Sequence, residues 1–205
     1  MTSAELTALL DIVKVGDILG YHVDPTNAGF SGLPSVLTEL GGELCHVEIV
    51  AEKIYDTTGK CIDLNCIVAD GTEVCYHTFV TRLNPLDIFT IFILEYEGCT
   101  QEQRGQMLEL AITEAWETLV YNWDIIEIIG TKQAETEIPI VGFFFNKFVW
   151  TTPPSDGKEL PGTICSKSVT KYIRSVFPTF MKGYWIDYIT PSAIFNCEDI
   201  SIYKP

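Results

Sequence analysis

The sequence predicts one α+β domain over residues 1–205, in which an antiparallel β-meander packs against helices. Two patterns carry this prediction. Strand-like runs are separated by turn residues, and elsewhere apolar residues recur at helical spacing behind capping residues. Hydrophobic residues make up 47% of the 205, which is enough for one sizeable core. We see no internal repeat and no linker, so a second domain is not expected.

Three consecutive runs form the predicted meander. Residues 44–55 end at a Thr-Thr-Gly turn, residues 60–69 end at Asp70-Gly71, and residues 72–81 follow. Asp-Gly is a favoured hairpin turn because both residues tolerate positive φ. We expect residues 88–96 to continue the meander. A turn leading into a strand at 15–23 comes before these runs, and a terminal strand at 200–203 comes after them.

Helix starts are marked by capping residues. Thr2 with Glu5, and Thr100 with Gln103, have the spacing of a capping box, so a short helix and a longer one are expected after them. Thr190 and Pro191 have the residue types of an N-cap and a first helical position. The stretch 24–43 is rich in Gly, Pro, Ser and Asn and is interpreted as a loop that borders a cleft.

A further helix is predicted after Pro161 and Gly162, and Cys165 lies at its entry. Val169, Tyr172, Ile173 and Val176 give this segment an apolar stripe. A thiol at a helix N-terminus meets the positive end of the helix dipole and unpaired N–H groups, both of which favour thiolate. Cys165 is therefore a candidate nucleophile, although a small buried side chain is the commoner role of a lone cysteine at such a position.

Alternation along the first two meander strands selects a partner for this thiol. His46 and Glu48 share one face of the first strand, and Asp63 and Asn65 share one face of the second. If the two strands pair, His46 lies beside a carboxamide or a carboxylate. A histidine that is held by such a group and faces a thiol is the arrangement of thiol hydrolases. The alternative is a solvent-facing histidine paired with Glu48.

Five short motifs, taken in order, resemble the YiiX-type, circularly permuted branch of the NlpC papain-like cysteine hydrolases. They are Gly16-Asp17-Ile18-Leu19, Cys45-His46-Val47-Glu48-Ile49-Val50, Tyr121-Asn122-Trp123-Asp124, Thr163-Ile164-Cys165-Ser166-Lys167-Ser168-Val169 and Ile189-Thr190-Pro191-Ser192. In that branch the histidine strand precedes the cysteine helix. The resemblance spans residues 15–191 and rests on the shared order of the motifs.

The resemblance implies a circularly permuted papain-like fold with Cys165 as nucleophile and His46 as base. It places the third polar residue late in the second strand, where Asn65 is our choice and Asp63 the reserve. Asn can orient an imidazole but does not stabilise imidazolium as a carboxylate does. Glu48 stands where the family commonly has a small residue, and it is placed to raise the pKa of the histidine or to narrow the site.

The implied activity is hydrolysis of an amide, either peptide or isopeptide, or of an ester, without a cofactor or metal. Cell-wall peptides are the most familiar substrates of such proteins, and delivery by a phage, by lysis or by another route would be needed to reach a wall. Two alternatives on the same scaffold are an acyltransferase acting on lipid, with the aromatic stretch 143–150 holding an acyl chain, and a catalytically silent binding module.

Composition excludes other classes of function. The net charge of −15 opposes binding to nucleic acid and to anionic membranes. No apolar run has the length of a membrane span, and no secretory signal is visible. Seven cysteines without a pattern fit free thiols, so we expect a soluble cytoplasmic protein. A zinc module formed by Cys61, Cys66, Cys75 and His77 is a weaker alternative, because their spacing is not that of common zinc motifs.

Overall fold

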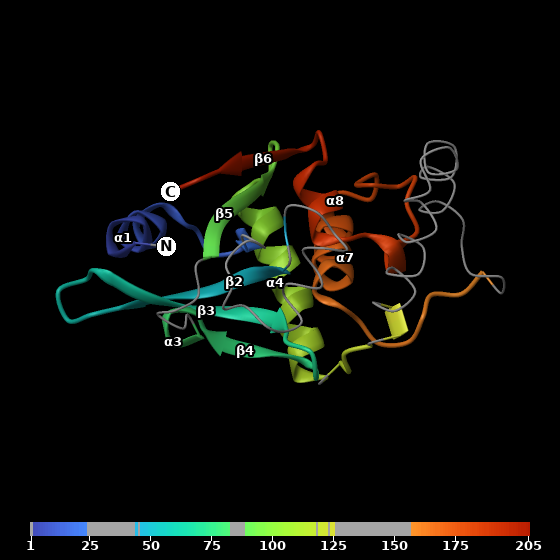
Figure 1. Ribbon diagram of the computed structural model, residues 1–205, viewed down its shortest axis with the longest axis horizontal. Coiled ribbons are helices and arrows are strands. Elements are labelled where there is room, and N and C mark those ends of the chain that lie inside the picture. The colour runs from blue at the N-terminus through green and yellow to red at the C-terminus, as the bar shows by residue number, and fades with distance from the viewer. Residues whose placement is uncertain are drawn as a thin grey trace.

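A computed structural model describes residues 2–23, 44, 46–82, 89–117, 119–122, 124–125 and 157–205 (Figure 1). The stretch interpreted as a cleft-bordering loop, 24–43, lies outside the described residues, as does the aromatic stretch 143–150. No helix within the described ranges is both long and apolar enough to cross a membrane.

Six strands form one sheet, and every neighbouring pair is antiparallel. The strand order is β4-β3-β2-β1-β5-β6. The strands are β1 (Ile18–Val23), β2 (His46–Tyr55), β3 (Cys61–Ala69), β4 (Val74–Thr78), β5 (Phe89–Tyr96) and β6 (Ile200–Tyr203). The predicted α+β class with an antiparallel sheet is confirmed, and so is the terminal strand.

The meander ends at β4, which corrects the expectation that residues 88–96 continue it. After β4 the chain forms the short helix α3 (Phe79–Arg82), and β5 pairs instead with β1 on the far side of β2. The reason lies in β1. Ile18 and Leu19 are successive residues that point to opposite faces, and both are at most 2% exposed, so β1 is covered on both sides. A strand buried in this way needs a partner along each edge, and β5 supplies the second.

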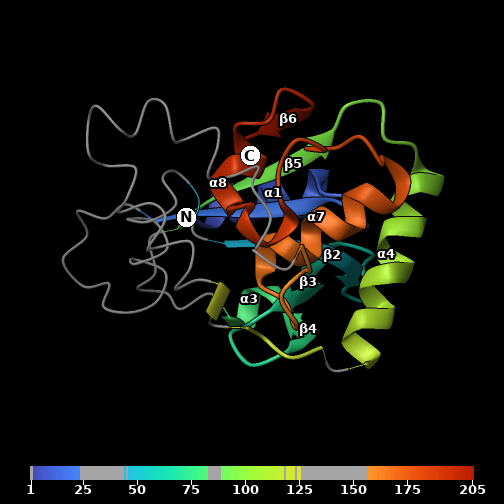
Figure 2. The ribbon, with the colours of Figure 1, turned by 90° about the vertical axis from the view of Figure 1, so that its right-hand side faces the viewer.

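Helices cover both faces of the sheet. The long helix α4 (Gln101–Trp116), α7 (Cys165–Val176) and α8 (Pro191–Phe195) lie on one face, and α1 (Ser3–Ile12) lies on the other (Figure 2). A 3-10 turn, η1 (Ile186–Tyr188), links α7 to α8. Each face has its own apolar layer. Val47 and Ile49 belong to the layer under α7, whereas Leu19 and Val50 belong to the layer under α1.

The predicted helix starts are confirmed. Thr2 and Glu5 form a complete capping box before α1, and Thr100 and Gln103 form one before α4. The Thr190 side chain accepts a hydrogen bond from the N–H of Ala193 at the start of α8. These caps satisfy backbone donors that a helix leaves unpaired in its first turn.

The Gly16-Asp17 motif fixes the position of β1 against β2. Gly16 has a φ of +87°, and a Cβ at this position would lie 2.6 Å from the Cβ of Arg104. The Arg104 side chain is 3% exposed and forms ion pairs with Asp17 and Glu95. Backbone bonds then join Gly16 to Val50 and Val50 to Asp17. A residue with a side chain does not fit at position 16, and the register of β2, whose first residue is His46, depends on this corner.

Candidate active site

Helix α7 begins at Cys165 and has no side-chain cap. Its N-cap residue is Ile164, which makes no side-chain hydrogen bond to the helix. The backbone N–H groups of Ser166 on α7 and Val47 on β2 lie near the sulfur of Cys165 and lower the pKa of its thiol. Cys165 is 4% exposed, so its side chain lies almost covered between the start of α7 and the first residues of β2.

His46 is the first residue of β2, and its ring forms a hydrogen bond with Cys165. The structure therefore brings together the two residues that the sequence selected from opposite parts of the chain. The His46 side chain keeps 18% of its surface exposed. Its ring packs against the ring of Tyr21 on the adjacent strand, with centroids 5.4 Å apart and planes tilted by 59°.

The surroundings of the two groups favour their charged forms. Burial alone would raise the pKa of the Cys165 thiol, but the charge of His46 and its hydrogen bond to the sulfur outweigh burial and lower that pKa. The two backbone N–H groups lower it further. Burial alone would lower the pKa of His46, but Cys165, followed by Glu48, outweighs burial and raises it to about 9. Both shifts favour a thiolate at Cys165 and an imidazolium at His46.

Glu48 is the second group on the histidine. It lies two residues after His46 on the same face of β2 and is 1% exposed. The Nε2 of His46 lies 3.7 Å from the Oε2 of Glu48, which is an ion-pair distance rather than a direct hydrogen bond. Nε2 is itself buried and makes no hydrogen bond to any described residue. The hydroxyl of Tyr21 donates to the Oε1 of Glu48 and holds the carboxylate beneath the imidazole.

Asn65, which we expected to orient His46, is not brought to it. Its Nδ2 donates to the Oε2 of Glu52 at 3.0 Å, and its Oδ1 accepts from Thr78. The reserve candidate, Asp63, accepts the backbone N–H groups of Leu64 and Val80.

The strand register explains this correction. Asn65 lies opposite Glu52, after an irregularity between Val50 and Glu52. Glu52 is six residues along β2 from His46, which corresponds to about 20 Å of extended strand. Alternation placed Asn65 and His46 on polar faces, but it did not show where along the strands they stand.

A buried ion pair holds the loop that leads into Cys165. The Nζ of Lys167 lies 2.5 Å from the Oδ1 of Asp187 and donates to the carbonyl of Leu160 at 2.7 Å. The Oδ2 of Asp187 accepts the N–H of Leu160 at 3.0 Å and the indole N–H of Trp185 at 2.8 Å. Both polar groups of the Leu160 backbone are thus fixed, and the loop enters α7 in one position.

Replacing Lys167 with Met should destabilise the protein strongly, because Asp187 is fully buried and would keep an uncompensated charge. We expect a loss of about 3–5 kcal/mol in the free energy of unfolding, measured by denaturant titration. Lys171→Met is the matched control on the same helix. Lys171 is 28% exposed, and its partner Glu114 keeps hydrogen bonds from Ser168 and Tyr172, so the loss of Lys171 should cost clearly less than the loss of Lys167. Equal losses in the two variants would contradict this role for Lys167.

A polar network fixes α7 against α4. Glu114 on α4 accepts hydrogen bonds from Ser168 at 3.1 Å and from the hydroxyl of Tyr172 at 2.9 Å. Ser168 also shares a 2.8 Å hydrogen bond with Thr163 in the loop before Cys165. Glu114 is 7% exposed, and these hydroxyl donors stabilise its carboxylate together with the ion pair to Lys171. The helix that carries the thiol is therefore anchored at its first turn and along its length.

Comparison of the chain with protein-family models, with curated proteins and with solved structures found no match. The candidate active site is therefore identified from the arrangement of its own residues. From the sequence, Glu48 is placed to raise the pKa of His46 or to narrow the site, and the structure puts its carboxylate beside the imidazole. Sequence reasoning assigned no role to Tyr21, which stands opposite His46 on the neighbouring strand and donates to Glu48.

Proposed function

We propose that this protein is a thiol hydrolase with a circularly permuted papain-like fold, in which Cys165 is the nucleophile and His46 the general acid and base. The observation that carries the proposal is the hydrogen-bonded pair of a cysteine at an uncapped helix start and a histidine at a strand end. The lowered pKa of the thiol and the raised pKa of the imidazole, at about 9, support the same roles.

The proposed acylation step begins with attack of the Cys165 thiolate on the carbonyl carbon of an amide or ester. A C–S bond forms and the carbonyl electron pair moves to oxygen, where N–H groups at the start of α7 stabilise the negative charge. Collapse of this intermediate breaks the bond to the leaving group, which takes a proton from the His46 imidazolium. A thioester on Cys165 and a neutral imidazole remain.

The deacylation step uses the same two residues. Neutral His46 accepts a proton from water, and the resulting hydroxide attacks the thioester carbon. The C–S bond breaks, the acid product leaves, and the thiolate returns beside imidazolium. Glu48 takes the orienting role that the sequence predicts for Asn65. A carboxylate below the ring stabilises imidazolium in both steps, and Tyr21 holds that carboxylate in position.

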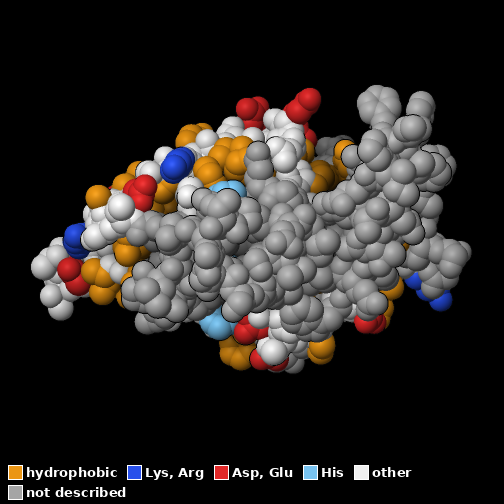
Figure 3. All heavy atoms as spheres, viewed as in Figure 1, with side chains coloured by type: hydrophobic (Ala, Val, Ile, Leu, Met, Phe, Trp, Pro, Cys, Tyr) orange, Lys and Arg blue, Asp and Glu red, His pale blue; other side chains and the backbone are white. Residues whose placement is uncertain are grey.

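The substrate class proposed is a peptide or isopeptide amide, with cell-wall peptides as one case, or an ester. This class follows from the resemblance and from the chemistry of a thiolate nucleophile. The net charge of −15 disfavours anionic partners such as nucleic acid. On the face shown in Figure 3, acidic side chains stand around the rim and the basic side chains of the described residues do not gather into a patch.

Site-directed alkylation tests the proposed pair. The folded protein is treated with limiting iodoacetamide at about pH 6, where ordinary thiols of pKa about 8.5 are almost fully protonated, and the modified cysteine is identified by peptide mass spectrometry. We expect Cys165 to be modified first, and His46→Ala to slow its modification. Modification of another cysteine first, or an unchanged rate in His46→Ala, would contradict the pair.

A catalytically silent binding module is the second candidate, and the burial of Cys165 favours it. With 4% of its surface exposed, this cysteine sits within the apolar layer under α7. In a silent module the folded protein would leave Cys165 unmodified at every pH, and only denaturant would expose it. The alkylation experiment thus separates the two candidates.

A further inference from the structure

The hairpin between β3 and β4 gathers three side chains with metal-ligating atoms. Asp70 opens the turn, and Gly71 follows with a φ of +103°. The Oδ1 of Asp70 accepts both the N–H and the hydroxyl of Thr72, at 2.9 Å and 2.7 Å. The second oxygen, Oδ2, points away from the turn and lies 3.1 Å from the Nε2 of His77. Oδ1 therefore stabilises the turn, whereas Oδ2 lies outside the turn and faces His77.

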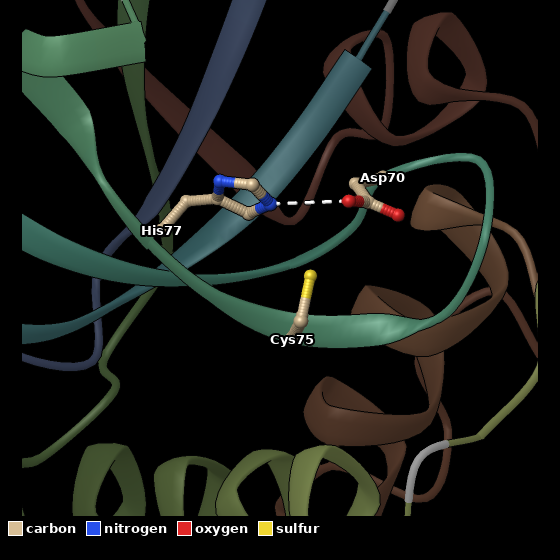
Figure 4. Close-up of side chains that lie close together, drawn as sticks. All are labelled: Asp70, Cys75 and His77. Carbon is tan, nitrogen blue, oxygen red and sulfur yellow. Dashed lines mark hydrogen bonds and ion pairs between the residues drawn. The ribbon is translucent and has the colours of Figure 1, made fainter.

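Cys75 completes the group. Cys75 and His77 are two residues apart on β4, so their side chains emerge on the same face. Their cross-strand partners are Val68 and Cys66. Figure 4 shows the sulfur of Cys75 pointing toward the gap between the imidazole of His77 and the carboxylate of Asp70. The three ligand atoms all lie within 4.8 Å of one another.

We propose that Asp70, Cys75 and His77 bind a divalent transition-metal ion of the zinc type. Thiolate, imidazole and carboxylate are the ligand set that such ions accept, and three protein ligands leave one position for water. Tetrahedral bond lengths require about 3.4 Å between the nitrogen and oxygen ligands and about 3.6 Å between sulfur and nitrogen. The 3.1 Å between the Nε2 of His77 and the Oδ2 of Asp70 is close to the first value. Because all three ligand atoms lie within 4.8 Å of one another, a shift of at most about 1.2 Å in the Cys75 side chain meets the second.

Two of the four residues considered for a zinc module, Cys61 and Cys66, are instead buried in the apolar layer under α1. Within the described residues the three-ligand group contains only Cys75 and His77 of those four, together with Asp70.

A bound ion would brace the hairpin beside the candidate active site. The carbonyl of Thr72 accepts the N–H of Tyr121 at 2.8 Å, and Tyr121 pairs with Thr163 two residues before Cys165. Tyr121 thus joins the turn to the loop that enters α7. None of the three ligands takes part in the proposed hydrolysis. The metal-site proposal and the proposal of a catalytic pair can therefore be tested independently.

Cobalt(II) spectroscopy tests the site, because a thiolate bound to Co²⁺ gives a charge-transfer band that imidazole and carboxylate do not. The full chain carrying Cys165→Ala is used, which removes the catalytic thiol as a competing ligand, after treatment with a chelator. We expect the band to appear with one equivalent of Co²⁺ and to disappear in the added variant Cys75→Ser. The control Cys197→Ala should keep it. Absence of the band, or its survival in Cys75→Ser, would overturn the proposal.

Thermal unfolding gives a second readout. A ligand that binds only the folded chain raises its stability with concentration, so added Zn²⁺ should raise the unfolding midpoint of the Cys165→Ala protein. His77→Ala should remove most of this rise. An equal rise with and without His77 would show that zinc binds elsewhere, and would count against the site.

Discussion

Cys165→Ala is expected to abolish hydrolysis, with a fall in kcat/KM of about 10⁴-fold or more on any substrate that the wild-type protein turns over. The reason is that the proposed thioester forms on the sulfur of Cys165, so the covalent step is lost with that atom. The measurement is release of the leaving group from a panel of peptide, isopeptide and ester substrates.

Cys66→Ala is the matched control for this variant. Cys66 is also fully buried, at 0% exposure, but lies in the apolar layer under α1. It should lose stability, because a buried sulfur is removed, while keeping activity in the fraction that is folded. Activity retained in Cys165→Ala, with none lost relative to Cys66→Ala, would end the proposal that Cys165 is the nucleophile.

Glu48→Gln is expected to lower kcat roughly 10–10³-fold while leaving the protein folded. Gln has nearly the same shape and can still accept from Tyr21, but it carries no charge. The Glu48 carboxylate helps to raise the pKa of His46. Loss of its negative charge should lower the pKa of His46 from about 9 and, because the imidazolium beside the thiol is then less populated, raise the pKa of Cys165.

The pH profile separates a positioning role of Glu48 from a merely structural one. In the wild-type protein, turnover should rise with pH as Cys165 ionises and fall again near pH 9, where His46 loses the proton that the leaving group needs. In Glu48→Gln the rising limb should move to higher pH and the falling limb to lower pH, so the profile narrows.

Asn65→Ala is the control for Glu48→Gln, since Asn65 bonds to Glu52 and Thr78 and not to the histidine. It should change neither kcat nor the two limbs of the profile. If Asn65→Ala narrowed the profile and Glu48→Gln did not, the carboxamide and not the carboxylate would be the group that orients His46.

Local patterns in the sequence were enough to predict most of the elements. The capping boxes at Thr2 and Thr100, the Asp70-Gly71 turn and the start of α7 at Cys165 are all confirmed. Each of these features depends on residues within a few positions of one another, so it can be predicted from a short stretch of sequence. The pairing of β5 with β1 cannot be predicted in this way. It joins strands that are far apart in the sequence, and it is determined by which strand faces must be buried.

The candidate site also has a part that could be predicted from the sequence and a part that could not. A thiol at a helix start and a histidine on a strand are visible as single residues, and the structure brings Cys165 and His46 together. The prediction that Asn65 orients His46 was wrong because it depends on the pairing register between β2 and β3. An irregularity after Val50 and a shifted pairing put Asn65 opposite Glu52. Glu48 is identified as the orienting residue only from the structure, in which it is buried beside the imidazole and accepts a hydrogen bond from Tyr21.

The rate of Cys165 alkylation as a function of pH tests the central claim most directly. A thiolate held by imidazolium reacts at a rate that titrates well below pH 8.5, the ordinary pKa of a cysteine thiol, and His46→Ala should move that titration upward. A rate that titrates at the ordinary value in both proteins, or a Cys165 that stays inert until the chain unfolds, would contradict a thiolate–imidazolium pair at this site.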